Sequence, residues 1–241
     1  NFPVQGRSVK STLHSVPDCQ AITKKAIVER LKKAYEEKGW LNETGAKYPV
    51  EVAIHKDNVL LTIDTSGSGL NKRGYRLAQG EAPIKETLAA SLIRLANWKG
   101  DSPLIDPFCG SGTIAIEACL IAQNIAPGFN RDFVSEEWNI MPPNIYDELR
   151  DEADRMADYD KEIEVYASDI DPEMVEIAKR NAEEVGLGDI IQFNVKDVNT
   201  LTIDSEGPVA LVGNPPYGER IGDREEVEEM YRYIGSLMKQ H

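Results

Sequence analysis

The chain has 241 residues, of which 41% are hydrophobic and 28% are charged, and its formal net charge at pH 7 is −14. These values are typical of a globular protein with a buried core, and they argue against a disordered chain. No stretch of about 18 apolar residues occurs, which argues against a membrane-spanning helix. The length suits one large domain or two smaller ones.

The three cysteines, Cys19, Cys109 and Cys119, are odd in number and show no Cys-x-x-Cys spacing. This pattern argues against a disulfide framework and against a zinc site, and it favours a reducing, cytoplasmic compartment. The first residues include neither an initiator methionine nor the basic and apolar regions of a signal peptide. We therefore expect no bound metal and a chain that begins inside a longer gene product.

The charge is distributed unevenly along the chain. Residues 1–100 contain 16 Lys and Arg against 10 Asp and Glu, a net charge of +6, whereas residues 101–241 contain 11 against 31, a net charge of −20. A basic half followed by an acidic half favours a polyanion-binding module joined to a catalytic domain. The alternative is that the acidic helices only keep the chain in solution.

The first predicted element is a helix over residues 15–39. Ser15 is a candidate N-cap, Pro17 suits the first turn, and Gly39 is a candidate stop signal. Apolar residues fall on one face of this helix at 3.6 residues per turn. The flank beside that face carries the basic residues Lys25, Lys32 and Lys33.

A β-hairpin is predicted next, because apolar residues alternate over residues 50–54 and 59–63 with a polar turn at 56–58. Helix and hairpin together predict an α+β domain over residues 1–64. Residues 65–80 begin with a Gly/Ser-rich stretch, and we interpret them as a linker. The linker includes a basic patch with Lys72, Arg73 and Arg76.

From residue 81 to residue 241, predicted strands and helices alternate. The strands cover residues 103–106, 163–168, 190–195 and 209–213, and the helices cover 83–97, 113–123, 172–185 and a segment from about 225. This order predicts a doubly wound, Rossmann-like α/β sheet. Residues 126–160 interrupt the pattern with a Pro-containing loop and an acidic amphipathic helix, which we interpret as an insertion.

A glycine-rich turn, DPFCGSGT at residues 106–113, joins the first of these strands to a helix. Its glycines let the backbone approach a ligand, and the helix N-terminus offers free N–H groups. Many such turns only connect a strand to a helix, so the turn alone does not establish a binding site.

Three aspartates follow the next two strands. Asp169 is placed to accept both ribose hydroxyls of a nucleoside. Asp171 precedes Pro172 and is equally well explained as a helix N-cap or as a ligand-binding residue. Asp197 could accept the exocyclic amine of an adenine ring, although a solvated loop aspartate explains it equally well.

The last predicted strand leads into NPPYGER at residues 214–220. The prolines fix the backbone and leave carbonyl groups without competing donors. The side-chain carbonyl of Asn214 and the main-chain carbonyl of Pro215 could accept both N–H bonds of a planar exocyclic amine, while Tyr217 stacks on the ring. A simple turn explains this motif less well.

These motifs resemble those of S-adenosylmethionine-dependent amino-methyltransferases. Further segments, including SVKS at 8–11, KRGYR at 72–76 and APIKETLAA at 82–90, resemble the bacterial THUMP-domain methyltransferases that make N2-methylguanine in large-subunit ribosomal RNA. The resemblance implies a partial THUMP RNA-binding domain over residues 1–64. It also implies a class I methyltransferase sheet over residues 81–241 that is truncated at its C-terminus, with four strands instead of seven.

The resemblance implies S-adenosylmethionine as cofactor and RNA, above all 23S ribosomal RNA, as partner. The residues expected to hold the cofactor are Asp106, Cys109, Gly110, Ser111, Gly112, Thr113, Asp169, Ile170, Asp171, Asp197, Val198 and Asn214. The residues expected at the target amine are Asn214, Pro215, Pro216 and Tyr217. RNA contacts are expected at Lys25, Lys32, Lys33, Lys72, Arg73 and Arg76. Methylation of transfer RNA guanine or of adenine N6, and a non-catalytic RNA-binding role in ribosome assembly, are the alternatives.

Overall fold

The computed structural model describes residues 1–78, 83–205, 207–216 and 224–239. The chain divides into two compact units. The N-terminal unit comprises residues 1–69 and 132–148, and the C-terminal unit comprises residues 70–131 and 149–241. None of the described helices is both long and apolar enough to cross a membrane.

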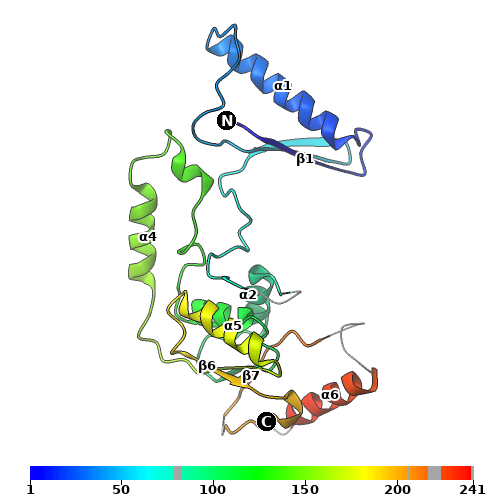
Figure 1. Ribbon diagram of the computed structural model, residues 1–241, viewed down its shortest axis with the longest axis vertical. Coiled ribbons are helices and arrows are strands. Elements are labelled where there is room, and N and C mark those ends of the chain that lie inside the picture. Colours follow the sequence, from blue (N-terminus) through cyan, green and yellow to red (C-terminus); the bar gives the residue numbers. More distant parts are fainter. Residues whose placement is uncertain (79–82, 206, 217–223, 240–241) are drawn as a thin grey trace. The chain divides into compact units, whose positions relative to one another are not determined.

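The N-terminal unit is built on a three-stranded sheet in the order β1-β2-β3. Its strands are β1 (Val4–Val9), β2 (Val50–His55) and β3 (Asn58–Ile63), with β1 parallel and β3 antiparallel to β2. Helix α1 (Val16–Ala34) packs along this sheet (Figure 1). The predicted α+β class and the hairpin are confirmed, whereas β1 was not predicted.

Local backbone conformation explains the turn and the helix end. Lys56 and Asp57 have φ angles of 50° and 62°, which suits the tight two-residue turns that match strand twist. Helix α1 ends at Ala34 rather than near Gly39, because Glu36 takes a left-handed conformation with φ 54° and the N–H of Glu37 bonds back to the carbonyl of Lys32 at 3.0 Å.

Part of the predicted insertion belongs to the N-terminal unit. Residues 132–148 include the short 3₁₀ helix η1 (Val134–Glu137) and the start of helix α4 (Ile145–Met156). Trp138 stacks on Tyr48 at a centroid distance of 4.8 Å, and its indole N–H donates to the carbonyl of Lys47 at 2.7 Å. The segment predicted over 126–160 is therefore divided between the two units.

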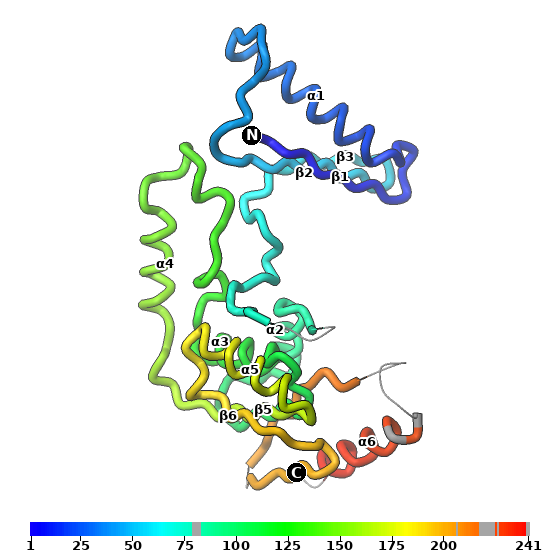
Figure 2. The backbone as a smooth tube through the Cα atoms, viewed as in Figure 1, coloured from blue at the N-terminus to red at the C-terminus, as the bar shows by residue number. Residues whose placement is uncertain are grey.

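The C-terminal unit contains a parallel sheet in the order β6-β5-β4-β7. Its strands are β4 (Leu104–Asp106), β5 (Val165–Asp169), β6 (Ile191–Val195) and β7 (Ala210–Leu211). The helices are α2 (Glu86–Leu95), α3 (Thr113–Ala122), α5 (Pro172–Glu183) and α6 (Arg224–Leu237), and the 3₁₀ turn η2 covers Val198–Thr200. Figure 2 shows α3 and α5 beside β5 and β6. The doubly wound α/β prediction is confirmed.

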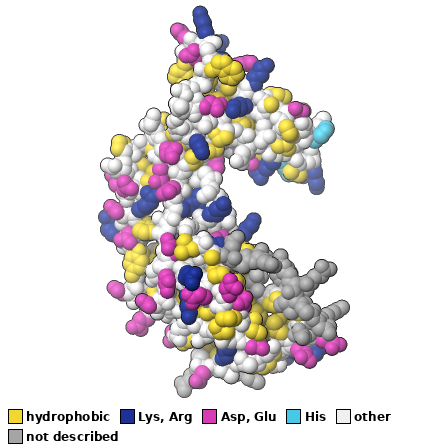
Figure 3. All heavy atoms as spheres, in the orientation of Figure 1, with side chains coloured by type: hydrophobic (Ala, Val, Ile, Leu, Met, Phe, Trp, Pro, Cys, Tyr) yellow, Lys and Arg dark blue, Asp and Glu magenta, His cyan; other side chains and the backbone are white. Residues whose placement is uncertain are grey.

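Successive side chains of β4 point to opposite faces of the sheet, so they join two different apolar clusters. Leu104 joins a large buried cluster with Ile114 of α3 and Val165, whereas Ile105 joins a second cluster with Leu237 of α6. Helix α3 is apolar on nearly all sides and is almost wholly buried. Among the described acidic residues only Glu86, Asp106 and Glu117 are buried, and Figure 3 shows many other acidic side chains on the surface.

The predicted linker differs from the structure. Residues 65–69 belong to the N-terminal unit, but residues from Leu70 onward pack in the C-terminal unit. The ring of Tyr75 is 1% exposed within the large apolar cluster, and its hydroxyl donates to Glu117 Oε1 at 3.1 Å. Burial, the charge of Glu117 and this hydrogen bond raise the pKa of Tyr75, so its hydroxyl stays a donor. This segment is therefore part of the core rather than a free connection.

Candidate functional site

A cavity of about 950 Å³ lies where β4, β5, β6 and β7 end. The carboxyl ends of parallel strands are where open α/β sheets bind ligands, because the connecting loops diverge there. Of the predicted site residues, the cavity wall includes Cys109, Gly110, Ser111, Thr113, Asp169, Ile170, Asp171, Asp197, Val198, Asn214, Pro215 and Pro216. Asp106 and Gly112 lie behind this wall, and Tyr217 lies outside the described residues.

The glycine-rich loop is held between β5 and α5. The N–H of Cys109 donates to the carbonyl of Ser168 at 2.9 Å, and the N–H of Gly110 donates to Asp169 Oδ2 at 2.9 Å. Gly112 has a φ of 83°, and a Cβ atom there would lie 3.0 Å from that of Ala178. Glycine therefore permits both the turn and the close approach to α5. Burial raises the pKa of the Cys109 thiol, so this side chain stays neutral.

The carboxylate of Asp169 joins two backbone segments of the cavity wall. Its Oδ2 accepts the N–H of Gly110 and its Oδ1 accepts the N–H of Asp171 at 3.1 Å. Each oxygen has a second lone pair, so the group can still accept hydroxyl groups from a ligand. Asp169 thus orders the glycine-rich loop and remains able to bind a ribose.

Asp171 and Asp197 both act as caps in the structure. Asp171 Oδ1 accepts the N–H of Glu173 at 2.8 Å at the start of α5, and Asp197 Oδ1 accepts the N–H of Asn199 at 2.9 Å at the start of η2. Both residues also line the cavity. The cap explanation of Asp171 is therefore correct, and a ligand contact through its second oxygen stays a prediction.

Asp106 is a buried carboxyl group directly behind the cavity wall. It is 0% exposed, its Oδ1 accepts the N–H of Phe108 at 3.2 Å, and its Oδ2 has no hydrogen-bond partner among the described residues. The pKa of Asp106 is raised to about 7, chiefly by burial and also by the charge of Asp169, while the hydrogen bond from Phe108 opposes this shift. A positively charged ligand group beside Asp106 would favour its ionised form.

The raised pKa of Asp106 predicts how the free energy of unfolding depends on pH. Because the folded-state pKa of Asp106 is raised, folding takes up a proton, and the free energy of unfolding falls as pH rises toward 7. Asp106→Asn removes this dependence. The free energy of unfolding of the variant, minus that of the parent chain, is expected to increase by about 2 kcal/mol between pH 5.5 and pH 7. Urea unfolding at both pH values measures the difference, and an equal stability difference at both would contradict the titration.

The segment predicted to bind the acceptor amine follows β7. The N–H of Val212 donates to the carbonyl of Ile105 at 3.0 Å, which extends the pairing with β4 beyond the strand. A Cβ atom on Gly213 would lie 3.3 Å from Asp106 Oδ1, so this segment passes closely over β4. Asn214, Pro215 and Pro216 therefore reach the cavity from the strand beside the glycine-rich loop.

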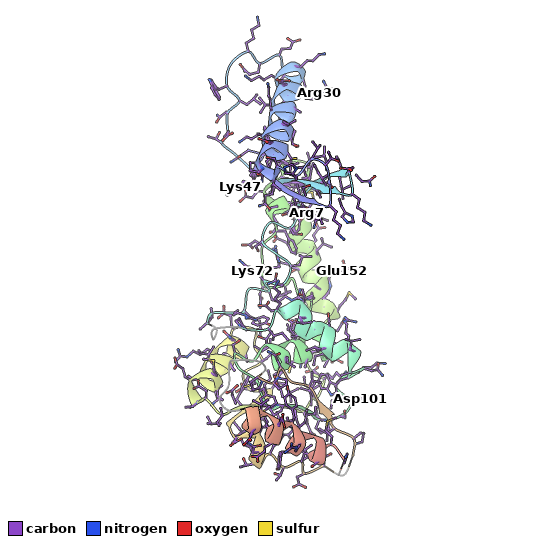
Figure 4. The ribbon with its side chains drawn as sticks, turned by 90° about the vertical axis from the view of Figure 1, so that its right-hand side faces the viewer. Arg7, Arg30, Lys47, Lys72, Asp101 and Glu152 are labelled. Atoms are coloured by element: carbon purple, nitrogen blue, oxygen red, sulfur yellow. The ribbon has the colours of Figure 1, made fainter. Side chains whose placement is uncertain are left out.

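The predicted RNA-contacting residues do not share one environment. Lys25, Lys33 and Lys72 are exposed and Lys32 is half-buried. Figure 4 labels Lys72 and three exposed cations of the N-terminal unit, Arg7, Arg30 and Lys47.

Arg73 and Arg76, in contrast, form ion pairs within the fold. The Arg73 guanidinium contacts Glu117 at 3.3 Å and Arg76 contacts Glu86 at 3.0 Å, with side-chain exposures of 12% and 15%. The structure therefore corrects the prediction that these two arginines face RNA: each pairs with a buried carboxylate.

Several residues of the cavity wall were not predicted. They are Ile114, Met174, Lys196, Asn199, Val227, Glu229 and Met230. Pro107 and Phe108, which also line the cavity, belong to the predicted glycine-rich turn, and Pro83 and Ile84 belong to the helix predicted over 83–97. Met174 lies one turn after Asp171, so helical spacing could have indicated it. Val227, Glu229 and Met230 come from α6, whose position depends on tertiary packing, and no local signal indicates them.

Comparison with known proteins connects this site to a family. The profile of the UPF0020 family, described as an RMKL-like methyltransferase domain, matches residues 73–241, and the THUMP domain profile matches residues 1–64. The chain is 59% identical over 239 residues to the putative RNA methyltransferase YpsC of Bacillus subtilis, covering 99% of the chain and 62% of that protein. It is 39% identical over 221 residues to the ribosomal RNA large subunit methyltransferase K/L of Shewanella baltica, covering 90% of the chain and 31% of that protein.

Solved structures show the same fold. A predicted N6-adenine-specific DNA methylase from Listeria monocytogenes is 57% identical with a TM-score of 0.93, covering 100% of this chain and 63% of that one. The putative methyltransferase SMU.472, solved in complex with SAH (S-adenosylhomocysteine), is 44% identical with a TM-score of 0.92 and the same coverages. The chain thus spans less than two thirds of the length of these proteins.

Proposed function

Because the chain belongs to the UPF0020 family of RMKL-like methyltransferase domains and carries a THUMP domain, we propose that it is part of an S-adenosylmethionine-dependent RNA methyltransferase. The observation that carries this proposal is the single cavity that brings together the glycine-rich loop, Asp169, Asp197 and Asn214–Pro216. We further propose that the methyl acceptor is the N2 amine of a guanine, in large-subunit ribosomal RNA.

The residues around the cavity fit this cofactor. A volume of about 950 Å³ is at the upper end of the range for small-molecule sites. Of the lining residues, Asp169 suits a ribose and Asp197 suits an adenine amine. When bound, S-adenosylmethionine supplies an electrophilic methyl group. The structural relative SMU.472 was solved with the demethylated product SAH.

The chain's own task is to orient the acceptor amine. The side-chain carbonyl of Asn214 and the carbonyl of Pro215 accept its N–H bonds and so direct the nitrogen lone pair toward the methyl group. As the nitrogen bonds to the methyl carbon, the bond from that carbon to the sulfonium sulfur would break, leaving SAH. The positive charge that grows on the nitrogen would be stabilised by these two oxygens until one N–H proton is lost to water. A paired base cannot enter such a cavity, so the target base has to be unpaired or flipped out of its helix.

Analysis of the methylated nucleoside tests the proposal. The protein is incubated with S-adenosylmethionine carrying a labelled methyl group and with unmodified fragments of large-subunit ribosomal RNA or transfer RNA, and the nucleosides are separated. N2-methylguanosine in the ribosomal fragment supports the proposal. N6-methyladenosine would favour the second candidate, suggested by the Listeria relative, and absence of product would favour a non-catalytic RNA-binding role.

Neutralising the four predicted RNA-contacting lysines tests their role. We propose contacts to RNA phosphates from Lys25, Lys32, Lys33 and Lys72, without Arg73 and Arg76. Changing the four lysines to alanine is expected to weaken RNA binding and to flatten its dependence on salt, by about 0.7 in logarithmic slope for each single-strand phosphate that is no longer neutralised. Fluorescence anisotropy over a series of salt concentrations measures this slope.

A control for the effect of each single charge is Arg232→Ala, which removes one exposed cation on α6 that contacts Glu228 at 3.3 Å. Its salt slope is expected to equal that of the parent. An unchanged slope in the lysine variant would mean that these lysines form an ordinary solvated surface.

A further inference from the structure

Arg76 connects two segments of the wall of the cofactor cavity. Its Nη2 donates to the carbonyl of Ile84 at 3.0 Å and to the hydroxyl of Thr113 at 2.9 Å. Ile84 and Thr113 both line the cavity, Ile84 just before α2 and Thr113 at the end of the glycine-rich loop. One nitrogen atom therefore fixes the spacing between the loop and the segment that leads into α2.

The guanidinium also forms an ion pair with Glu86, although Nε lacks the geometry of a hydrogen bond to it. Its Nε lies 3.0 Å from Glu86 Oε1, and the side chains of Arg76 and Glu86 are 15% and 6% exposed. Because Glu86 is the first residue of α2, this ion pair fixes the guanidinium relative to the helix that follows the Ile84 wall. A planar guanidinium can serve these separate acceptors at once, which one ammonium group cannot do with the same geometry.

Asn181 of α5 joins the residues that directly follow Arg76 to the glycine-rich loop. Its Oδ1 accepts the N–H of Leu77 at 2.9 Å, and its Nδ2 donates to the carbonyls of Ala78 and Ser111 at 3.1 and 3.0 Å. The Asn181 side chain is 1% exposed. The segment after Arg76 therefore stays attached to the glycine-rich loop when Arg76 alone is altered.

Arg73 offers a contrast three residues earlier. It has the same degree of burial and an ion pair with a buried glutamate of α3, Glu117, but Glu117 does not line the cofactor cavity. Loss of either arginine weakens a buried ion pair, and only Arg76 also contacts the cavity wall.

We propose that Arg76 is a positioning residue for the cofactor site, setting the distance between the glycine-rich loop and the Ile84 segment through Thr113. This inference rests on the proposed cofactor and is independent of the RNA target. Arg76 itself does not line the cavity, so its effect reaches the cofactor through Thr113 and Ile84.

Two matched substitutions test the proposal by separating affinity from stability. Arg76→Lys and Arg73→Lys each keep a cation beside a buried carboxylate, so both variants are expected to fold with similar small decreases in melting temperature. Arg76→Lys is expected to raise the Kd of S-adenosylhomocysteine about tenfold, the effect of removing one charge-assisted hydrogen bond, while Arg73→Lys leaves it unchanged. Calorimetry with S-adenosylhomocysteine measures both constants without RNA.

A double-mutant cycle tests the route through Thr113. Thr113→Val removes the hydroxyl that Arg76 contacts, so Arg76→Lys is expected to raise Kd much less in that background than in the parent. An equal increase in both backgrounds, or an equal increase caused by Arg73→Lys, would overturn the proposal. If the parent chain binds S-adenosylhomocysteine but methylates no guanine, the target base is wrong and the role of Arg76 stands.

Discussion

Asn214→Ala is expected to lower kcat by roughly 100- to 1,000-fold, the usual effect of removing one preorganised electrostatic group. In the proposed reaction, the side-chain carbonyl of Asn214 orients the acceptor amine and stabilises the positive charge that grows on its nitrogen. Such a contact is stronger in the transition state than in the ground state, so its loss appears mainly in turnover. The Kd of S-adenosylmethionine is expected to change much less.

Single-turnover measurements at saturating cofactor and RNA report this effect directly. Asn194→Ala is the matched control, because it truncates the same side chain at an exposed position of β6 outside the cavity wall, and it is expected to keep the parent rate. If Asn214→Ala methylates RNA as fast as the parent does, the amine-orienting role is wrong and the segment is only a turn.

One topological rule is enough to predict from sequence that the candidate site residues lie close together, whereas their roles toward a cofactor stay predictions. In a parallel sheet, residues that follow different strands meet at the same edge, however far apart they are in the chain. Asp169 ends one strand, Gly110, Asp197 and Asn214 follow three others, and all four residues line one cavity. Strand patterns and loop residues were sufficient for this prediction, because no side-chain geometry was needed.

The environment of the charged side chains, in contrast, could not be predicted from sequence alone. Arg73 and Arg76 were predicted to face RNA because they belong to a local basic cluster. Their partners are Glu117, which follows Arg73 by 44 residues, and Glu86, and both glutamates are buried on helices. Whether an arginine faces solvent or a buried carboxylate is decided by tertiary packing, which no local pattern reports.

The missed strand β1 has a similar explanation. Val4–Val9 contains Gly6 and Ser8 and has few apolar residues, so its alternation is weak. Its pairing partner β2 begins 46 residues after it, and α1 packs on it; a Cβ atom at Gly6 would lie 2.9 Å from the side chain of Gln20. The strand is therefore stabilised by non-local pairing, and glycine is needed for the close packing of α1.

Asp169→Ala is expected to weaken the binding of S-adenosylmethionine by about 1.5–3 kcal/mol, the range for hydrogen bonds to charged groups. The carboxylate accepts the N–H of Gly110 in the loop, so the variant loses part of the loop's support together with the proposed ribose contact. Asp169→Asn separates the two effects, because it keeps one carbonyl oxygen while removing the charge.

Asp171→Ala provides the comparison within the same segment. Its Oδ1 caps α5, so this variant is expected to lower the free energy of unfolding by about 1 kcal/mol while affecting cofactor affinity less than Asp169→Ala does. Titration calorimetry together with urea unfolding measures both quantities for each variant. If Asp169→Ala binds the cofactor as tightly as the parent, the ribose contact is ruled out, and Asp169 serves only to join the glycine-rich loop to the start of α5.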